Sequence, residues 1–171
     1  MIKEETGADP TLQVGAKGAF EVIVDSFTDF SPGTSMVLLR VDSHLTSTAI
    51  CYEVVFPSLV REAVLGGSEL LTTITNDAWY GHSSAPYQHW ALASMRAIEE
   101  GRYLARAANT GISGVVDPYG RVVAQSGIFE QASMVEEIRF LTYRTIYSRI
   151  GDAVAYAAIA IVALALLVLR R

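Results

Sequence analysis

Short apolar runs and longer periodic segments alternate along the middle of the chain. The apolar runs are rich in β-branched residues and are separated by Gly, Pro, Asn and Asp, a pattern typical of strands. Pro57 begins a predicted helix that ends at Gly66 and Gly67. The alternation predicts an α/β fold with a mixed sheet. We expect strands at residues 36–41, 45–50, 69–75, 112–117 and 121–125, with a further edge strand at 134–138.

A second, longer helix is predicted over residues 86–108, which contain a single glycine. Small and apolar side chains recur there at helical spacing and predict one packing seam. The seam consists of Trp90, Ala93, Ala97, Gly101, Leu104 and Ala108. At the end of this segment, Asn109 and Gly111 are interpreted either as turn residues or as part of a candidate site.

The most apolar segment, residues 153–169, contains no charged side chain and is followed by two arginines. At about 1.5 Å per residue it would span roughly 25 Å, slightly less than a hydrocarbon core of about 30 Å. We therefore expect a transmembrane helix at residues 150–169, extended by Ile150 and Gly151; the alternative is a buried core helix. Residues 1–30 have no clear period and no signal-peptide pattern, so they remain unassigned. Two membrane topologies stay open: the domain lies in the cytoplasm if the C-terminal helix acts alone, and it can lie outside if further helices precede it.

Composition narrows the possible functions. Of 171 residues, 51% are hydrophobic and 18% charged, with a formal net charge of -5, which argues against disorder and against a nucleic-acid-binding surface. The single cysteine excludes a disulfide within the chain and a multi-cysteine metal site. The three histidines lack metal-ligand spacing, so we expect no metal and no cofactor.

The strongest candidate for chemistry is Cys51. It lies where a predicted strand ends shortly before a helix, a place where a side chain is held rigidly and can face a cleft as a nucleophile. The alternative is a small buried hydrophobic residue. Because alternate strand residues share a face, we expect Glu53 to line the same pocket, with Tyr52 between them. The Glu53 carboxylate would orient a substrate amine or a water, or would simply be solvated.

A second candidate is the polar loop at residues 76–81, with the sequence NDAWYG. Its adjacent aromatic residues, Trp79 and Tyr80, are costly in a loop unless they pack or meet a ligand. Three interpretations stay open: a ligand contact, a cap on the core, or a position in the headgroup layer of a membrane.

Several strings together resemble one enzyme family. They are ICYEVVFPSLVR at residues 50–61, TITNDAWYG at 73–81, the segment 88–122 and the terminal apolar helix. They resemble the apolipoprotein N-acyltransferases, a branch of the carbon–nitrogen hydrolases or nitrilase superfamily, from about Phe30 to the C-terminus. The resemblance implies a partial nitrilase-like α-β-β-α sandwich at residues 31–145, followed by the transmembrane helix.

The resemblance also implies a function. Such enzymes lie in the bacterial inner membrane, with the catalytic domain on the extracytoplasmic side. They move an acyl chain from a phospholipid to the N-terminal amine of a diacylglyceryl-cysteine lipoprotein. Cys51 matches the cysteine of the family's Glu-Lys-Cys triad and would hold the chain as a thioester. Glu53 would assist, the backbone N–H of Tyr52 would help to hold the oxyanion, and Trp79 and Tyr80 would contact lipid.

The family's Glu and Lys stand upstream of the cysteine, the Lys in a segment resembling K-x-x-L-V-P-F-G-E. No such segment precedes Cys51 here, so no role is assigned to Lys3, Lys17, Glu4, Glu5 or Glu21. We expect this chain to be the C-terminal part of such an enzyme and to have little acyltransferase activity by itself. The alternatives are a nitrilase-type amidase and a non-catalytic, membrane-attached remnant.

Overall fold

Six strands form one sheet in the computed structural model, which describes residues 35–170. Neighbours along the chain are neighbours in the sheet. The central strands β2, β3 and β4 are parallel, whereas the pairs β1–β2, β4–β5 and β5–β6 are antiparallel. The predicted mixed α/β sheet is confirmed. Its strands are β1 (Leu39–Val41), β2 (His44–Ile50), β3 (Leu70–Asn76), β4 (Leu104–Asn109), β5 (Gly114–Val116) and β6 (Val122–Gln125).

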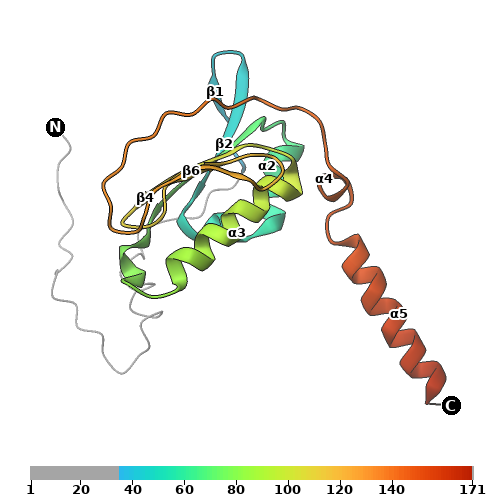
Figure 1. Cartoon of the computed structure of the whole chain (residues 1–171). Coiled ribbons are helices and arrows are strands. Elements are labelled where there is room, and N and C mark those ends of the chain that lie inside the picture. Colours follow the sequence, from blue (N-terminus) through green and yellow to red (C-terminus); the bar gives the residue numbers. More distant parts are fainter. Residues whose placement is uncertain (1–34, 171) are drawn as a thin grey trace, which may run out of the picture. The chain divides into compact units, whose positions relative to one another are not determined.

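Helices connect the parallel strands and continue beyond the sheet (Figure 1). Two of them, α2 and α3, supply the crossovers that parallel strands require. As expected, α2 begins at Pro57 and gives way to the two glycines after Leu65. The helices are η1 (Cys51–Val55), α2 (Pro57–Leu65), η2 (Asp77–Tyr80), α3 (Ala85–Glu100), α4 (Ile146–Ile150) and α5 (Ala153–Leu169).

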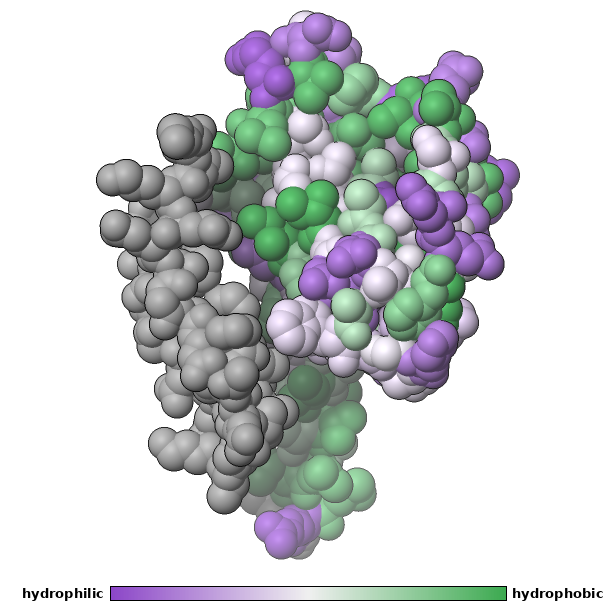
Figure 2. All heavy atoms as spheres, turned by 90° about the vertical axis from the view of Figure 1, so that its left-hand side faces the viewer, coloured by the Kyte–Doolittle hydropathy of each residue, from purple (hydrophilic) through white to green (hydrophobic). Residues whose placement is uncertain are grey.

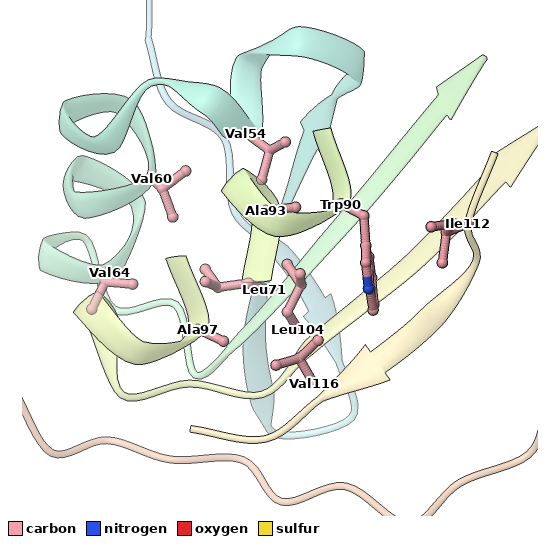
Figure 3. Close-up of a cluster of buried hydrophobic side chains, with 10 residues drawn as sticks. All are labelled: Val54, Val60, Val64, Leu71, Trp90, Ala93, Ala97, Leu104, Ile112 and Val116. Atoms are coloured by element: carbon pink, nitrogen blue, oxygen red, sulfur yellow. The ribbon is translucent and has the colours of Figure 1, made fainter. Parts of the chain in front are cut away.

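The core lies between α2, α3 and one face of the sheet (Figure 3). Leu104 of β4 and Val116 of β5 are fully buried at its centre. On the helical side, small residues of α3 allow the close approach that the predicted seam requires. The buried cluster consists of Val54, Val60, Val64, Leu71, Trp90, Ala93, Ala97, Leu104, Ile112 and Val116.

The predicted helix over residues 86–108 is wrong from Gly101 onward. Helix α3 ends at Glu100, because Gly101 adopts a left-handed conformation with φ 63° and its N–H bonds back to the last turn. Leu104 and Ala108 therefore lie in β4, paired in parallel with β3. The apolar side chains on both sides of Gly101 are buried, so their spacing did not reveal the change of structure.

The predicted edge strand at residues 134–138 is also wrong, because residues 131–145 contain neither helix nor strand. This segment is held by isolated contacts instead. The backbone N–H of Leu141 donates to the carbonyl of Glu69, and the Tyr143 carbonyl accepts from the buried Arg102 guanidinium. The apolar residues at 134, 135 and 138 therefore did not lead to ladder pairing here.

The predicted transmembrane helix at residues 150–169 is not supported. Among residues 35–170, no helix combines the length and apolar character needed to cross a membrane. Ile150 belongs to the separate helix α4, which Gly151 ends with φ 56°, and Asp152 precedes α5, so neither residue expected to lengthen the span extends α5. The alternative of a buried core helix is not found either: α5 has 17 residues with no buried side chain, and its hydrophobic surface is visible in the lower part of Figure 2.

The last residue of α3 has a buried carboxyl group. Glu100 is fully buried, and its Oε2 accepts a hydrogen bond from the Ser148 hydroxyl of α4 at 2.6 Å. The other carboxylate oxygen, Oε1, has no hydrogen-bond partner among the described residues. Burial raises the pKa of Glu100 above its ordinary value of 4.5. The attachment of α4 to α3 therefore depends on a carboxyl group that is costly to ionise.

We expect Glu100→Gln to flatten the dependence of unfolding free energy on pH above 4.5. Because the folded-state pKa lies above the unfolded value, ionisation of Glu100 lowers stability as pH rises through this interval. Glutamine keeps an acceptor for Ser148 without the charge. Urea unfolding at a series of pH values measures the slope, and Glu62→Gln, which removes an exposed carboxylate, controls for net charge. An unchanged slope in Glu100→Gln contradicts the expectation.

Candidate active site

The candidate nucleophile lies at a sharp turn between a strand and a helix. Cys51 follows the last residue of β2 and begins η1, and its backbone is left-handed, with φ 54°. This conformation is rare for a residue with a side chain and is found mainly where surrounding contacts enforce it. The Cys51 side chain is half-buried. A rigid, partly accessible thiol is what covalent catalysis requires.

The three segments singled out in the sequence meet at one edge of the sheet. Because β2, β3 and β4 are parallel, their carboxyl ends lie together, with Ile50 opposite Ile74 and Asn76 opposite Asn109. Cys51, the loop after β3 and the turn after β4 all leave the sheet there. Ligand sites of parallel α/β sheets form at this edge.

The Glu53 carboxylate does not lie as the strand alternation predicted, because the chain leaves β2 before reaching it. Glu53 is exposed in η1, and its Oε2 accepts a hydrogen bond from the backbone N–H of Ile50 at 2.7 Å. It therefore closes the turn around Cys51. The alternation argument was wrong, because Cys51 and Glu53 lie in η1 and not in a strand. Glu53 nevertheless belongs to the same turn as Cys51.

Aromatic side chains surround the turn. Tyr52 and Trp79 are exposed, Trp79 to 71%, and Tyr80 is half-buried. The rings of Tyr52 and Tyr80 lie 5.9 and 6.2 Å from the imidazole of His89, between ring centroids. Burial raises the pKa of Tyr80 above its ordinary value. Tyr52 and Tyr80 therefore both lie near the His89 ring, and Trp79 adds an exposed ring in η2.

A buried charged cluster that the sequence analysis missed lies behind Cys51. Asp77 Oδ1 accepts from His89 Nδ1 at 3.0 Å, and Asp77 Oδ2 accepts from Arg106 Nη2 at 2.8 Å. No side chain of the three is more than 2% exposed. On the other side of the ring, His89 Nε2 lies 3.3 Å from the carbonyl oxygen of Cys51. The cluster thus connects η2, α3 and β4 to the candidate nucleophile.

Electrostatics hold the Asp77 carboxyl in its charged form. Burial by itself would raise its pKa, but the hydrogen bond from His89 and the nearby Arg106 guanidinium outweigh burial, so the pKa lies below its ordinary value of 3.8. The hydroxyl of Thr75 also donates to Asp77 Oδ1, at 3.0 Å. Asp77 is therefore a buried anion with three donors.

Gly111 has a different role from the turn residue predicted. A Cβ atom at this position would lie 2.2 Å from Asp77 Oδ2, so only glycine lets the chain after β4 pass over the carboxylate. Arg106 also binds this segment, because its Nε donates to the carbonyl of Ile112 at 3.1 Å. The turn after β4 and the buried cluster therefore form one packed unit.

The signals for this cluster were weak in the sequence. His89 was considered only as a metal ligand, and Arg106 was placed at the end of a helix. Residues 35–170 contain no group of three or more His, Cys, Asp or Glu residues that could hold a metal ion. The side chains considered for the missing triad positions, Lys3, Lys17, Glu4, Glu5 and Glu21, lie outside the described residues, as does the unassigned segment 1–30.

The family profile of the carbon–nitrogen hydrolases matches residues 18–147. The chain belongs to the carbon–nitrogen hydrolase family. The family resemblance seen in the sequence is thereby confirmed, and the sheet edge described above is the candidate active site of this family member.

Two curated relatives are apolipoprotein N-acyltransferases. The one from Geobacter metallireducens is 41% identical over 138 residues, which are 81% of this chain and 26% of the relative. The one from Shewanella oneidensis is 44% identical over 109 residues, or 64% of this chain and 21% of the relative. The carbon–nitrogen hydrolase chain thus spans about a quarter of the length of the curated relatives it matches.

Among solved structures, the chain is similar to an amidase from Nesterenkonia sp. AN1. A mutant of that amidase has a TM-score of 0.50 and 29% sequence identity, covering 61% of this chain and 42% of the amidase. In that structure the acetamide moiety of fluoroacetamide is covalently added at the active-site cysteine. The likeness supports a nitrilase-type α/β fold for this chain.

Proposed function

We propose that the protein to which this chain belongs is an apolipoprotein N-acyltransferase with Cys51 as its nucleophile. The observation that carries the proposal is the left-handed turn at Cys51, at the edge where three parallel strands end. Similarity to named N-acyltransferases over most of the chain supports the reaction type. A partly exposed thiol in a turn that also carries the exposed Tyr52 suits a lipid acyl donor.

The proposed reaction has two steps. The Cys51 thiolate attacks the ester carbonyl of a phospholipid, the lysophospholipid leaves as an alcohol, and the acyl chain remains as a thioester. The N-terminal amine of a diacylglyceryl-cysteine lipoprotein then attacks the thioester, loses a proton and restores the thiol. A thioester suits this relay because it keeps the acyl group activated.

The proposed roles of the surrounding residues follow from their places around the turn. Tyr52, Trp79 and Tyr80 contact the donor lipid through their accessible rings, and the backbone N–H of Tyr52 contributes to holding the oxyanion. Glu53 orders the turn and assists the incoming amine. We also propose that the complete enzyme works at the bacterial inner membrane, on the extracytoplasmic side, where both lipid substrates are available.

The proposal is tested by intact-mass spectrometry of the chain after incubation in detergent with an activated acyl ester or a phospholipid. We expect a hydroxylamine-labile acyl mass on the wild type and none on Cys51→Ser. The activated ester should react faster with the folded chain than with the urea-unfolded chain, because only the folded turn presents the thiol. Equal rates in the two states, or no adduct on a chain shown to be folded, contradict the proposal.

With the phospholipid we expect only slow acylation of this chain. Residues 35–170 contain no lysine, so the lysine of the family's triad cannot come from them. Transfer at a rate comparable to that of a complete N-acyltransferase contradicts this expectation.

An amidase is the second candidate, favoured by the likeness to the Nesterenkonia enzyme. The acceptor distinguishes the two functions. Once the thioester has formed, a diacylglyceryl-cysteine peptide should discharge it faster than water does if the chain belongs to an N-acyltransferase. Discharge by water alone, with turnover of small amides, supports the amidase instead. A folded chain that never acquires an acyl group supports a non-catalytic remnant.

A further inference from the structure

The strained backbone of Cys51 has one specific side-chain contact. Its carbonyl oxygen faces the Nε2 atom of His89 at 3.3 Å, across a distance of 38 residues in the chain. A left-handed backbone at a residue with a side chain persists only where neighbouring groups enforce it. The His89 ring, from the second turn of α3, is placed to enforce this conformation through its contact with the Cys51 carbonyl oxygen.

The His89 ring is itself fixed from behind. Its Nδ1 atom lies 3.0 Å from Asp77 Oδ1, and Arg106 Nη2 lies 2.8 Å from Asp77 Oδ2 and 3.2 Å from His89 Nδ1. The side chains of all three residues are buried. The Asp77 carboxylate lies at the Nδ1 side of the ring and the Cys51 carbonyl at the Nε2 side. A series of contacts therefore runs from Arg106 through Asp77 and His89 to the Cys51 carbonyl oxygen.

We propose that His89 is a positioning residue that holds Cys51 in its left-handed conformation, with Asp77 and Arg106 holding the His89 ring. The inference rests on the proposed function, since it takes Cys51 as the nucleophile. His89 contacts the backbone of Cys51 and acts on the reaction through that residue. Its effect is on the direction of the thiol and of the neighbouring backbone N–H groups, which must face the acyl carbonyl carbon and its oxygen.

Two substitutions distinguish the contact made by Nε2 of His89 from the contact made by Nδ1. In His89→Gln the side-chain amide reaches the place of Nε2 and keeps a donor for the Cys51 carbonyl. In His89→Asn the shorter amide reaches only the place of Nδ1, so it keeps the Asp77 contact and loses the Cys51 contact. Both variants introduce an uncharged amide of similar chemistry at the same buried site. The comparison between them isolates the contact with Cys51.

Two reactions of the same thiol supply the readout. Acylation by an activated ester passes through a tetrahedral intermediate and requires a directed thiol and oxyanion donors, whereas alkylation by iodoacetamide requires only an accessible thiolate. Cys51 is the single cysteine of the chain, so the alkylated mass and the part of the acyl mass that neutral hydroxylamine removes report on Cys51. Melting temperatures from circular dichroism identify any variant that fails to fold.

We expect His89→Asn to acylate about tenfold more slowly than the wild type or slower still, because small displacements of a reacting group have large effects on rate. Its alkylation rate should change by less than about threefold, and His89→Gln should keep both rates within about threefold of the wild type. A loss of folding would instead slow acylation while exposing the thiol to faster alkylation, and the melting temperature would reveal it.

Two outcomes overturn the inference alone: equal acylation by the Asn and Gln variants, or parallel changes in acylation and alkylation. A wild type that acylates no faster folded than unfolded overturns the proposed function as well. The failure of the inference is thus distinguishable from the failure of the function on which it rests.

Discussion

Arg106→Met is expected to destabilise the chain by about 3–5 kcal/mol, because it leaves the buried Asp77 carboxylate without its countercharge. The side chains of both residues are fully buried, with 2.8 Å between Arg106 Nη2 and Asp77 Oδ2. Methionine fills much of the volume of the arginine stem, so the loss reports on charge more than on packing. Urea unfolding followed by tryptophan fluorescence measures the change.

A second substitution and an exposed control sharpen this prediction. Adding Asp77→Asn to Arg106→Met should restore part of the lost stability, since a neutral amide needs no countercharge. Arg121→Met removes an ion pair of the same 2.8 Å length with Asp117, but with an arginine that is 73% exposed, and should cost less than about 1 kcal/mol. Equal losses at Arg106 and Arg121 would show that burial of the pair is unimportant.

The same ion pair gives stability a pH dependence. Because the folded-state pKa of Asp77 lies below 3.8, its contribution to stability is complete above that value and is lost as pH falls through the folded-state pKa. Removing the guanidinium raises the folded-state pKa, so Arg106→Met should begin to lose this contribution at a higher pH than the wild type. If the wild type and Arg106→Met lost stability over the same pH interval, the stabilising role of the Asp77–Arg106 pair would be contradicted.

Trp90→Ala should have a comparable effect, with a loss of about 3–5 kcal/mol, through packing instead of charge. The indole lies between α3 and the strands that follow it (Figure 3), is 7% exposed, and donates from Nε1 to Gln125 at 3.1 Å. A Cβ atom on Gly114 would be 3.0 Å from the ring, which shows how closely β5 approaches it. Truncation would therefore leave a large cavity and an unpaired amide oxygen.

The chain supplies a matched control for Trp90 in its only other tryptophan. Trp79 is 71% exposed in the loop after β3, so Trp79→Ala should change the unfolding free energy by less than about 0.5 kcal/mol. Far-ultraviolet circular dichroism is the appropriate signal, because both variants lose an indole. If Trp79 contacts the donor lipid as proposed, its removal slows acylation while leaving stability unchanged. A large stability loss at Trp79 would assign it to the core.

The sequence predicted the elements whose ends are marked by backbone chemistry. Asp42 and Ser43 separate β1 from β2, Pro57 begins α2, and the turn containing Gly120 joins β5 to β6, all near the expected positions. Proline and glycine restrict or release the backbone locally, so their effects can be read without knowing the rest of the fold. The end of α3 at Gly101 was missed because apolar residues continue through it at a helical spacing.

The candidate site was predicted in part. Cys51, Tyr52, Trp79 and Tyr80 were identified from their positions after apolar strands, and parallel pairing places those positions at one edge. The Glu53 geometry failed because a strand alternation was continued across a turn that only the φ of Cys51 reveals. Such a change of backbone conformation leaves no periodic signal in the side chains.

The buried cluster could not be found in this way. Asp77, His89 and Arg106 belong to three elements, and polar residues separated in sequence normally face solvent. Their burial becomes evident only when the parallel register of β3 and β4 brings the segments together.

The apolar run at residues 153–169 predicted a membrane span, but the left-handed backbone of Gly151 separates α4 from α5 and so limits the length of α5.

The order of the strands also has a consequence for how the chain acquires its structure during synthesis. Each strand of the sheet pairs with the one translated immediately before it, from β1 to β6. A nascent chain can therefore add strands at one growing edge as they leave the ribosome. Residues paired between neighbouring strands are at most 33 apart in the chain, as for Leu71 and Leu104, and such a sequential order favours rapid folding. The contacts from Arg61 to the carbonyls of Ser148 and Arg149, 87 and 88 residues away, form only after the whole sheet has been synthesised. Folding that advances with translation would leave the attachment of α4 as its final step.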